Sequence, residues 1–303
     1  MYLDHFRLKE FPFGITPDTS FYFASTTAQQ ALNTLLVAIR GGEGFIKITG
    51  EVGTGKTLLC RQLLLSLGSD FQTAYIPNPY LTPQGLLLEL AEELGVETSD
   101  FRGAAESQAQ HLLLKALNHR LLDLARADKP VLVCLDEVQA MPIETLEALR
   151  LLTNLETERR KLVQVVIFGQ PELDEKLDHP SIRQLKQRIT FDYHLGPLAG
   201  PELARYLDHR MTVAGYDGAR LFSRPALWIL SWRTHGFPRL VNIVVHKALM
   251  SSYGRGKRTV GLREMYEAIV DTASVKIHGH GLVLRALGLF VLCLVVAQLA
   301  RSL

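Results

Sequence analysis

One short stretch, GEVGTGKT at residues 50–57, limits what this chain can fold into more than any other feature. It has the pattern Gly-x4-Gly-Lys-Thr, with a β-branched stretch (GFIKITG) before it and a helix-like stretch (KTLLCRQLLLSLG) after it. A glycine-rich turn between a strand and a helix directs successive backbone N–H groups toward one point, and such a point suits a phosphate group. The sequence therefore predicts a P-loop, or Walker A motif, within an α/β fold.

This loop predicts a binding site for the phosphates of ATP together with Mg²⁺. Lys56 is expected to reach the β- and γ-phosphate oxygens, and the Thr57 hydroxyl is expected to ligate Mg²⁺. The residues expected to contact the nucleotide here are Gly50, Glu51, Val52, Gly53, Thr54, Gly55, Lys56, Thr57 and Leu58.

Two adjacent acids, Asp136 and Glu137, follow the apolar run VLVCL, which is typical of a central strand in a parallel sheet. Ligands of such sheets bind beyond the carboxyl ends of the strands. Asp136 is therefore expected to hold Mg²⁺ through water, and Glu137 to polarise the attacking water as a general base. A solvated strand end is the alternative interpretation, and the P-loop favours the catalytic one.

Strand-like and helix-like patterns alternate through the first two thirds of the chain. The predicted strands are residues 45–49, 72–76, 131–135, 163–168 and 189–194. This alternation predicts a five-stranded parallel sheet with helices on both faces. After Gly196-Pro197 only helical patterns follow, at residues 201–214, 224–234, 238–253 and 262–274. The expected divisions are an α/β domain at 1–196, a helical domain at 197–277 and an apolar tail at 281–301.

Charge divides between the same two regions. Residues 1–195 hold 19 Lys and Arg against 25 Asp and Glu, whereas residues 196–280 hold 12 against 6. The basic excess of the second region is compatible with DNA phosphates, with anionic lipid headgroups or with a plain solvated face. The three cysteines show no metal-binding or disulfide spacing, so a disulfide scaffold is excluded and buried thiols are expected.

The tail contains a stretch, 286–300, with no charged residue between Arg285 and Arg301. As a helix it would span about 22 Å, or about 28 Å with residues 282–285 included, against about 30 Å for a bilayer core. Its apolar residues lie on all sides, which is not typical of an interfacial amphipathic helix. We expect a membrane anchor, with packing against a partner or a disordered or buried tail as alternatives.

The adjacent Asp-Glu pair and the strand order resemble the AAA+ ATPases. In that class a polar sensor residue stands at the tip of the fourth strand, where this chain has Gln170 in IFGQPEL. A simple turn before Pro171 is the alternative interpretation of Gln170. A second sensor arginine begins the third helix of the lid, and Arg239 in HGFPRLVN matches that position. A cation at a helix start opposes the helix dipole and therefore needs an anionic partner or solvent.

The resemblance also implies contacts that reach beyond these motifs. An arginine finger acts on the nucleotide of a neighbouring subunit, so a ring or head-to-tail oligomer is implied. Arg188, directly before the fifth strand, is the expected finger, and Arg183 is the alternative. The N-terminal segment FPFGITPD is expected over the adenine ring through Pro12 and Phe13.

Longer stretches of the sequence indicate a particular group within the AAA+ ATPases. YLDHFRLKEFPFGITPD, LDEVQAMPIETLEALRLLTNLET and IFGQPELDEKL resemble the ExeA/GspA-type AAA+ ATPases of type II secretion and type IV pilus assembly, in particular those of the MSHA pilus. The resemblance covers about residues 1–275. It implies an ATP hydrolase at the cytoplasmic face of the inner membrane, with pilus or secretion assembly proteins as partners. Longer members carry a peptidoglycan-binding region after a transmembrane segment. None is expected here, because the chain ends at Leu303.

Two other functions stay open. A DNA-handling AAA+ ATPase of the transposition or initiator type would share the fold and the basic lid. The chain shows no helix-turn-helix and no aromatic-basic platform, so nucleic acid is not an expected partner. The third possibility is a scaffold that binds ATP but hardly hydrolyses it, and Glu137 argues against this function.

Overall fold

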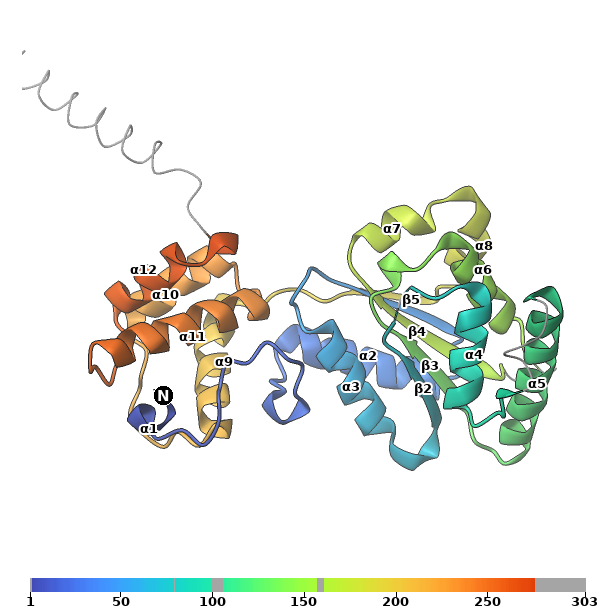
Figure 1. The fold of residues 1–303 in the computed structure, drawn as a ribbon, viewed down its shortest axis with the longest axis horizontal. Coiled ribbons are helices and arrows are strands. Elements are labelled where there is room, and N and C mark those ends of the chain that lie inside the picture. The colour runs from blue at the N-terminus through green and yellow to red at the C-terminus, as the bar shows by residue number, and fades with distance from the viewer. Residues whose placement is uncertain (1, 79, 100–105, 157–160, 276–303) are drawn as a thin grey trace, which may run out of the picture.

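In the computed structural model, an α/β domain and a helical domain lie side by side along the long axis of the molecule (Figure 1). The structure describes residues 2–78, 80–99, 106–156 and 161–275. The apolar tail expected at 281–301 lies outside these residues. Within the part that is described, no helix is both long and apolar enough to span a bilayer.

The sheet of the α/β domain has five parallel strands in the order β2-β3-β4-β1-β5. They are β1 (Phe45–Thr49), β2 (Gln72–Ile76), β3 (Val131–Leu135), β4 (Val163–Gly169) and β5 (Phe191–His194). The predicted five-stranded parallel sheet is thus confirmed, although β5 begins two residues later than expected. Because the strands share one direction, their carboxyl ends meet at one edge, where β1 leads into the P-loop and β3 into Asp136.

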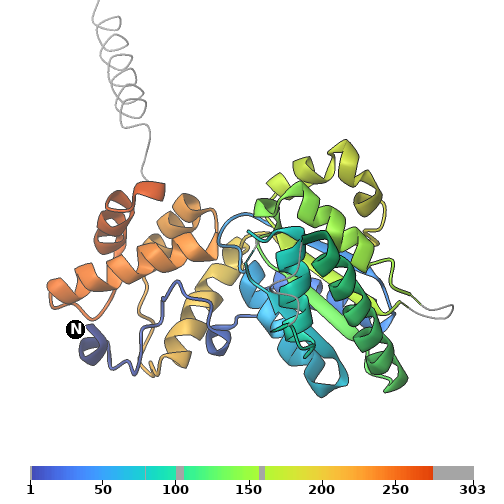
Figure 2. The same cartoon turned by 45° about the vertical axis from the view of Figure 1, so that its right-hand side comes forward.

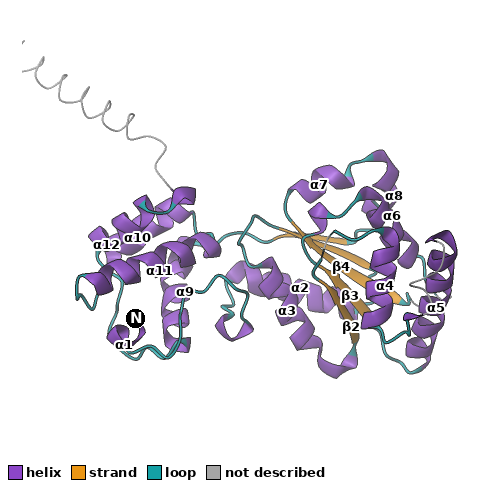
Figure 3. Cartoon of the chain, in the orientation of Figure 1, coloured by secondary structure: helices purple, strands orange, loops and turns teal. Residues whose placement is uncertain are grey.

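Helices cover both faces of this sheet (Figure 3). Alternate strand residues face opposite sides. Ile48, Cys134 and Phe168 pack with one group of helices, and Val133 and Ile167 pack with the other. The first group is α2 (Thr26–Arg40) and α3 (Lys56–Leu67); the second includes α4 (Pro83–Glu93), α5 (Glu106–Arg126) and α6 (Ile143–Leu152). Two short helices, α7 (Glu172–Leu177) and α8 (Arg183–Lys186), precede β5.

Helix starts follow the side chains that cap them. Thr82 caps α4, because its hydroxyl accepts a hydrogen bond from the Gly85 N–H at 3.1 Å. The cap of α2 is Ser25, which accepts from Ala28 N–H at 3.2 Å, and not Thr26 or Thr27 as the pattern suggests. A helix-like pattern runs over residues 142–158, whereas α6 ends at Leu152.

The helical domain, here called the lid, contains α9 (Gly200–Val213), α10 (Arg224–Thr234), α11 (Pro238–Gly254) and α12 (Leu262–Val270). The N-terminal segment packs into it, including the short helix α1 (Tyr2–Phe6), as the blue chain beside the orange helices shows (Figure 2). Its buried side chains share one hydrophobic cluster with α9 to α12: Tyr2, Phe6, Leu8, Phe13 and Phe21. The domain expected at 1–196 includes this segment, whereas its apolar side chains complete the lid core.

A buried carboxylate joins the two domains. Glu202, in the first turn of α9, accepts hydrogen bonds from the N–H and hydroxyl of Thr26, each at 2.7 Å, and from the N–H of Ala199 at 3.1 Å. Burial alone would raise the pKa of the Glu202 carboxyl, but these hydrogen bonds outweigh it and the pKa lies below its usual value. The N-termini of α2 and α9 are therefore held by a single ionised group.

Candidate active site

Glycines shape the loop between β1 and α3. Gly53 and Gly55 have φ angles of +81° and +101°, in the left-handed region where a side chain is strained. A Cβ atom at Gly50 would lie only 2.7 Å from the Leu195 carbonyl oxygen. The glycines that the motif requires are thus explained by the wrapped path of the loop.

Lys56 begins α3 and points back into this loop. It is 4% exposed, and its Nζ donates to the carbonyl oxygens of Gly50 at 2.6 Å and Glu51 at 3.1 Å. Burial lowers the pKa of the Lys56 ammonium, and the nearby charges of Glu137 and Asp136 oppose that shift only in part. An ammonium group this poorly hydrated would gain strongly from anionic phosphate oxygens.

Thr57 and Asp136 meet at the same edge of the sheet. The Thr57 hydroxyl donates to Asp136 Oδ2 at 2.6 Å, and Asp136 is 3% exposed. Burial raises the pKa of the Asp136 carboxyl despite the hydrogen bond from Thr57. A hydroxyl beside a carboxylate suits Mg²⁺, which takes few protein ligands and completes its shell with phosphate oxygens and water. Among the described residues, no group of three or more His, Cys, Asp and Glu side chains forms an all-protein metal site.

Glu137 follows directly, in a left-handed conformation with φ of +54°. Its Oε2 accepts hydrogen bonds from two side-chain amides, Gln139 at 2.6 Å and Gln170 at 3.0 Å. The backbone N–H of Gln170 in turn donates to Gln139 Oε1 at 3.0 Å. Burial would raise the pKa of Glu137, but the two amides, together with the charges of Lys56 and Arg239, bring it below its usual value. Gln170 therefore lies beside Glu137 at the tip of β4. Gln139, which the sequence analysis missed, links the two.

The lid approaches the P-loop through the start of α11. The backbone N–H of Arg239 donates to the Gly53 carbonyl at 3.1 Å. A Cβ atom at Gly53 would lie 2.3 Å from the Cβ of Arg239, so the backbone of the P-loop packs directly against the start of α11. Position 236 also requires a glycine, because a Cβ atom there would lie 2.2 Å from the Leu198 carbonyl oxygen. The HGFPR turn thus places Arg239 at the nucleotide loop.

A cavity of about 290 Å³ lies between the domains, and Asp136, Gln139 and Gln170 are not among the residues that line it. The α/β domain contributes Val52, Gly53, Gly55, Lys56, Thr57, Leu58 and Glu137. The lid contributes Tyr206, Arg210, Pro238, Arg239 and Asn242, and the N-terminal segment contributes residues 14–18.

The N-terminal residues at this cavity differ from those expected. Phe13 is 2% exposed and lies against Phe222 in the lid core, with ring centroids 6.3 Å apart. The Pro12 carbonyl accepts a hydrogen bond from Arg210. Neither residue lines the cavity, whereas Ile15, two positions after Phe13, does so and is 63% exposed.

Three polar lid residues at the cavity were also not anticipated. Tyr206 donates to Asn242 Oδ1 at 2.8 Å and accepts from Arg210 at 3.2 Å. The Asn242 amide donates to the Gly14 carbonyl at 3.2 Å, which fixes the N-terminal segment against α11. Their only signal in sequence is helical spacing, since Tyr206 and Arg210 lie one turn apart on α9.

The two arginines proposed as trans-acting residues lie elsewhere. Neither Arg183 nor Arg188 lines the cavity. Arg183 begins α8 and is exposed. Arg188 donates to Thr153 Oγ1 at 2.9 Å and also to Asn154.

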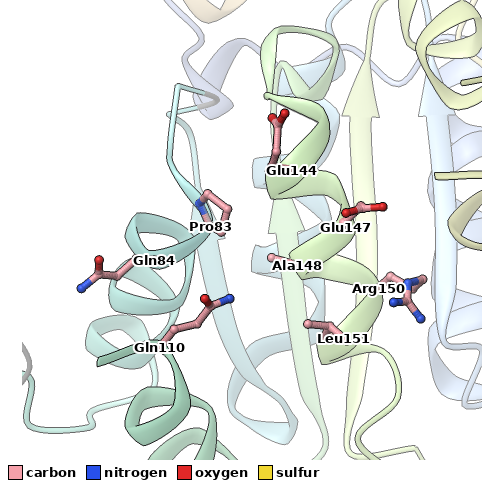
Figure 4. A pocket seen from close by; sticks show the side chains of 8 residues that line it. All are labelled: Pro83, Gln84, Gln110, Glu144, Glu147, Ala148, Arg150 and Leu151. Carbon is pink, nitrogen blue, oxygen red and sulfur yellow. The ribbon is translucent and has the colours of Figure 1, made fainter. Parts of the chain in front are cut away.

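A further cavity of about 600 Å³ lies among α4, α5 and α6 (Figure 4). Its polar lining comes from Gln84, Gln110, Glu144, Glu147 and Arg150. No residue of the P-loop and neither Asp136 nor Glu137 contributes to it, so its size does not mark it as the nucleotide site.

The parallel sheet, the P-loop and the acidic pair define an AAA-type P-loop fold. Residues 39–177 match the family model described as AAA domain. The chain is 38% identical over 279 residues to General secretion pathway protein A of Aeromonas hydrophila, a match that covers 92% of this chain and 50% of that protein. This similarity agrees with the resemblance that the sequence motifs indicate, and the chain spans about half the length of this curated relative.

Solved structures share the fold at lower identity. Cdc6p from Pyrobaculum aerophilum superposes with a TM-score of 0.64 at 18% identity, covering 86% of this chain and 72% of that one. The ORC2 protein of Aeropyrum pernix, in ADPNP–ADP complexes, gives a TM-score of 0.60 at 20% identity, covering 83% and 68%. These similarities support the AAA-type fold.

Proposed function

We propose that this chain binds ATP with Mg²⁺ and hydrolyses it. The observation that carries this proposal is that Lys56, Thr57 and the amide-held Glu137 line a single cavity, with Asp136 hydrogen-bonded to Thr57. A phosphate-binding loop alone would suit many ligands. A carboxylate that is kept ionised directly beside it can accept a proton from water.

In the proposed reaction, water attacks the γ-phosphorus and the bond to the β-γ bridging oxygen breaks, leaving ADP and phosphate. The Glu137 carboxylate accepts the proton of the attacking water. Gln170 and Gln139 keep that carboxylate ionised and oriented. Lys56 and Arg239 supply positive charge to the phosphate oxygens. Thr57 and, through water, Asp136 would hold Mg²⁺, which neutralises phosphate charge when bound.

We place the adenine against the N-terminal segment at Gly14–Pro17 in place of Pro12 and Phe13. Ile15 offers an exposed apolar side chain there, and Asn242 fixes the neighbouring backbone. The trans-acting arginine is proposed to be Arg188, with exposed Arg183 as the alternative, which requires a ring or head-to-tail oligomer.

We further propose that ATP turnover serves the assembly of a type II secretion machine or of a type IV pilus such as the MSHA pilus. The relative's name, General secretion pathway protein A, supports this assignment. Inner-membrane assembly proteins would be the partners, at the cytoplasmic face of the inner membrane. The uncharged stretch 286–300 within the tail at 281–301 supports an anchor there. The similarity to Cdc6p and ORC2 supports only the fold and does not support a DNA-handling function.

A substitution of the proposed base tests hydrolysis directly. Glu137→Gln should retain ATP binding and lower turnover by roughly 10²–10⁴-fold, because the general base is removed. Lys56→Ala should lose nucleotide binding as well. Binding of a fluorescent ATP analogue and release of phosphate would be measured side by side.

The matched control is Glu144→Gln, the same change at an exposed carboxylate of the other cavity. It should leave both binding and turnover unchanged. Wild-type turnover in Glu137→Gln would overturn the role given to Glu137.

A further inference from the structure

The outer surface of α10 carries two exposed tryptophans. Trp228 is 69% and Trp232 is 57% exposed, and their rings stack with centroids 6.1 Å apart and planes at 16°. They lie one helical turn apart, on the side opposite the buried Ala226 and Leu230. Tryptophan is seldom exposed to this extent, and a stacked exposed pair indicates a contact surface.

Helix α12 extends this surface with three apolar side chains spaced four residues apart. Leu262, Tyr266 and Val270 are 47%, 41% and 40% exposed. The opposite flank of α12 turns to α11, through a hydrogen bond from Ser251 to Glu267 and an ion pair between Lys247 and Asp271. The apolar flank therefore lies on the side of α10, with which α12 also packs. We call the residues Trp228, Trp232, Leu262, Tyr266 and Val270 the tryptophan face.

Basic residues surround this face. Arg224 is exposed one turn before Trp228, and the guanidinium of Arg233 lies 5.2 Å from the Trp232 ring centroid. Arg263 is exposed beside Leu262 and forms an exposed ion pair with Glu267, one turn along α12, at 3.4 Å. The region 196–280 as a whole carries 12 basic against 6 acidic residues. This charge is complementary to an anionic surface.

The chain also leaves the lid at this face. Arg233 donates a hydrogen bond to the carbonyl of Val275, the last described residue, which places Val275 beside Trp232. The uncharged stretch begins at Ala286, and 11 residues of extended chain reach at most about 40 Å. A bilayer that held this stretch would therefore lie within reach of the two tryptophans.

We propose that the tryptophan face rests on the headgroup region of an anionic bilayer and thereby fixes the orientation of the lid. Indole rings prefer this region, because the ring is apolar and its N–H finds polar partners there. Arg224 and Arg263 would contact lipid phosphates. The inference rests on the membrane location proposed above, but adds a second contact that is independent of the anchor.

Fluorescence gives a direct test, because Trp228 and Trp232 are the only tryptophans in the chain. The full chain would be reconstituted into vesicles of phosphatidylcholine with phosphatidylglycerol. We expect blue-shifted emission, quenching by lipids brominated near the headgroup and protection from iodide. Vesicles of phosphatidylcholine alone should reduce all three effects. The double variant Arg224→Glu/Arg263→Glu should remove the difference between the two lipid mixtures.

The control is Met250→Ala, an exposed residue of α11 outside the face, which should leave the emission unchanged. Vesicle flotation, measured on the same samples, reports the anchor separately. Protein that floats with vesicles while its tryptophans stay unshifted, unquenched and open to iodide would overturn the docking of this face. The proposed membrane location would then still stand. Protein that does not float at all would overturn both.

Discussion

At the scale of single residues, the site depends on how Glu137 is held. The side-chain amides of Gln139 and Gln170 both donate to one oxygen of its carboxylate. Gln139 Oε1 also accepts a hydrogen bond from the backbone N–H of Gln170. Hydrogen bonds to a carboxylate favour its ionised form, so they outweigh the effect of burial on its pKa. Gln139 is thus a positioning residue that acts through Glu137.

Replacing Gln139 should therefore change the pH dependence of hydrolysis. In Gln139→Ala the stabilisation of the ionised form is reduced, the pKa of Glu137 rises, and turnover on the acid side should fall at a higher pH than in the wild type. The profile of kcat against pH at saturating ATP measures this shift. Gln84→Ala, at the other cavity, is the control. A uniform loss of kcat with an unmoved acid limb would show that Gln139 has only a structural role.

At the scale of secondary-structure elements, the P-loop and the start of α11 are fitted to each other. Gly53→Ala would place a methyl group at a φ of +81° and 2.3 Å from the Cβ of Arg239. We expect a loss of about 1–3 kcal/mol in the free energy of unfolding, because the loop or the lid must move. ATP affinity should fall with it. Urea unfolding and nucleotide titration would measure the two effects.

Gly254→Ala provides the matched control, since nothing lies within 4 Å of a Cβ atom at the end of α11. Its urea concentration at half-unfolding should equal that of the wild type or be slightly higher. Equal stability of the two alanine variants would contradict the close approach at Gly53.

The elements that sequence could predict are those whose pattern is local. An apolar run such as VLVCL or a Gly-x4-Gly-Lys-Thr turn carries its own structure, so β3 and the P-loop were placed correctly. The contacts of Phe13 are not local, and no pattern within FPFGITPD shows that it packs on the lid. Gln139 was missed because the left-handed backbone at Glu137 turns the chain back on itself.

At the scale of the whole molecule, the N-terminal segment stabilises the lid as well as bordering the cavity. Phe13→Ala should cost about 3–5 kcal/mol of stability, because a buried aromatic side chain is removed from a packed core. Thermal unfolding would measure the loss. Phe11→Ala is the control on the same segment, since Phe11 is 41% exposed and should change the melting temperature little.

Assembly is the second property at this scale. If Arg188 acts across a subunit interface, Arg188→Ala and Glu137→Gln should each be inactive alone, whereas mixed oligomers should regain part of the ATPase activity. The mixture contains interfaces that pair an intact Glu137 with an intact Arg188. Recovery with Arg183→Ala in place of Arg188→Ala would assign the role to Arg183. No recovery with either variant would contradict a trans-acting arginine here.

The contact between the N-terminal segment and α11 has a consequence for biosynthesis. The hydroxyl of Tyr2 meets the Nδ1 of His246 at 2.9 Å, across 244 positions of sequence. At translation rates of about 5–20 residues per second, the first residues wait roughly ten to fifty seconds for their partners to be made. The α/β domain is complete on the ribosome well before that time. The apolar residues Tyr2, Phe6 and Phe13 therefore cannot reach their buried positions until the lid has been synthesised.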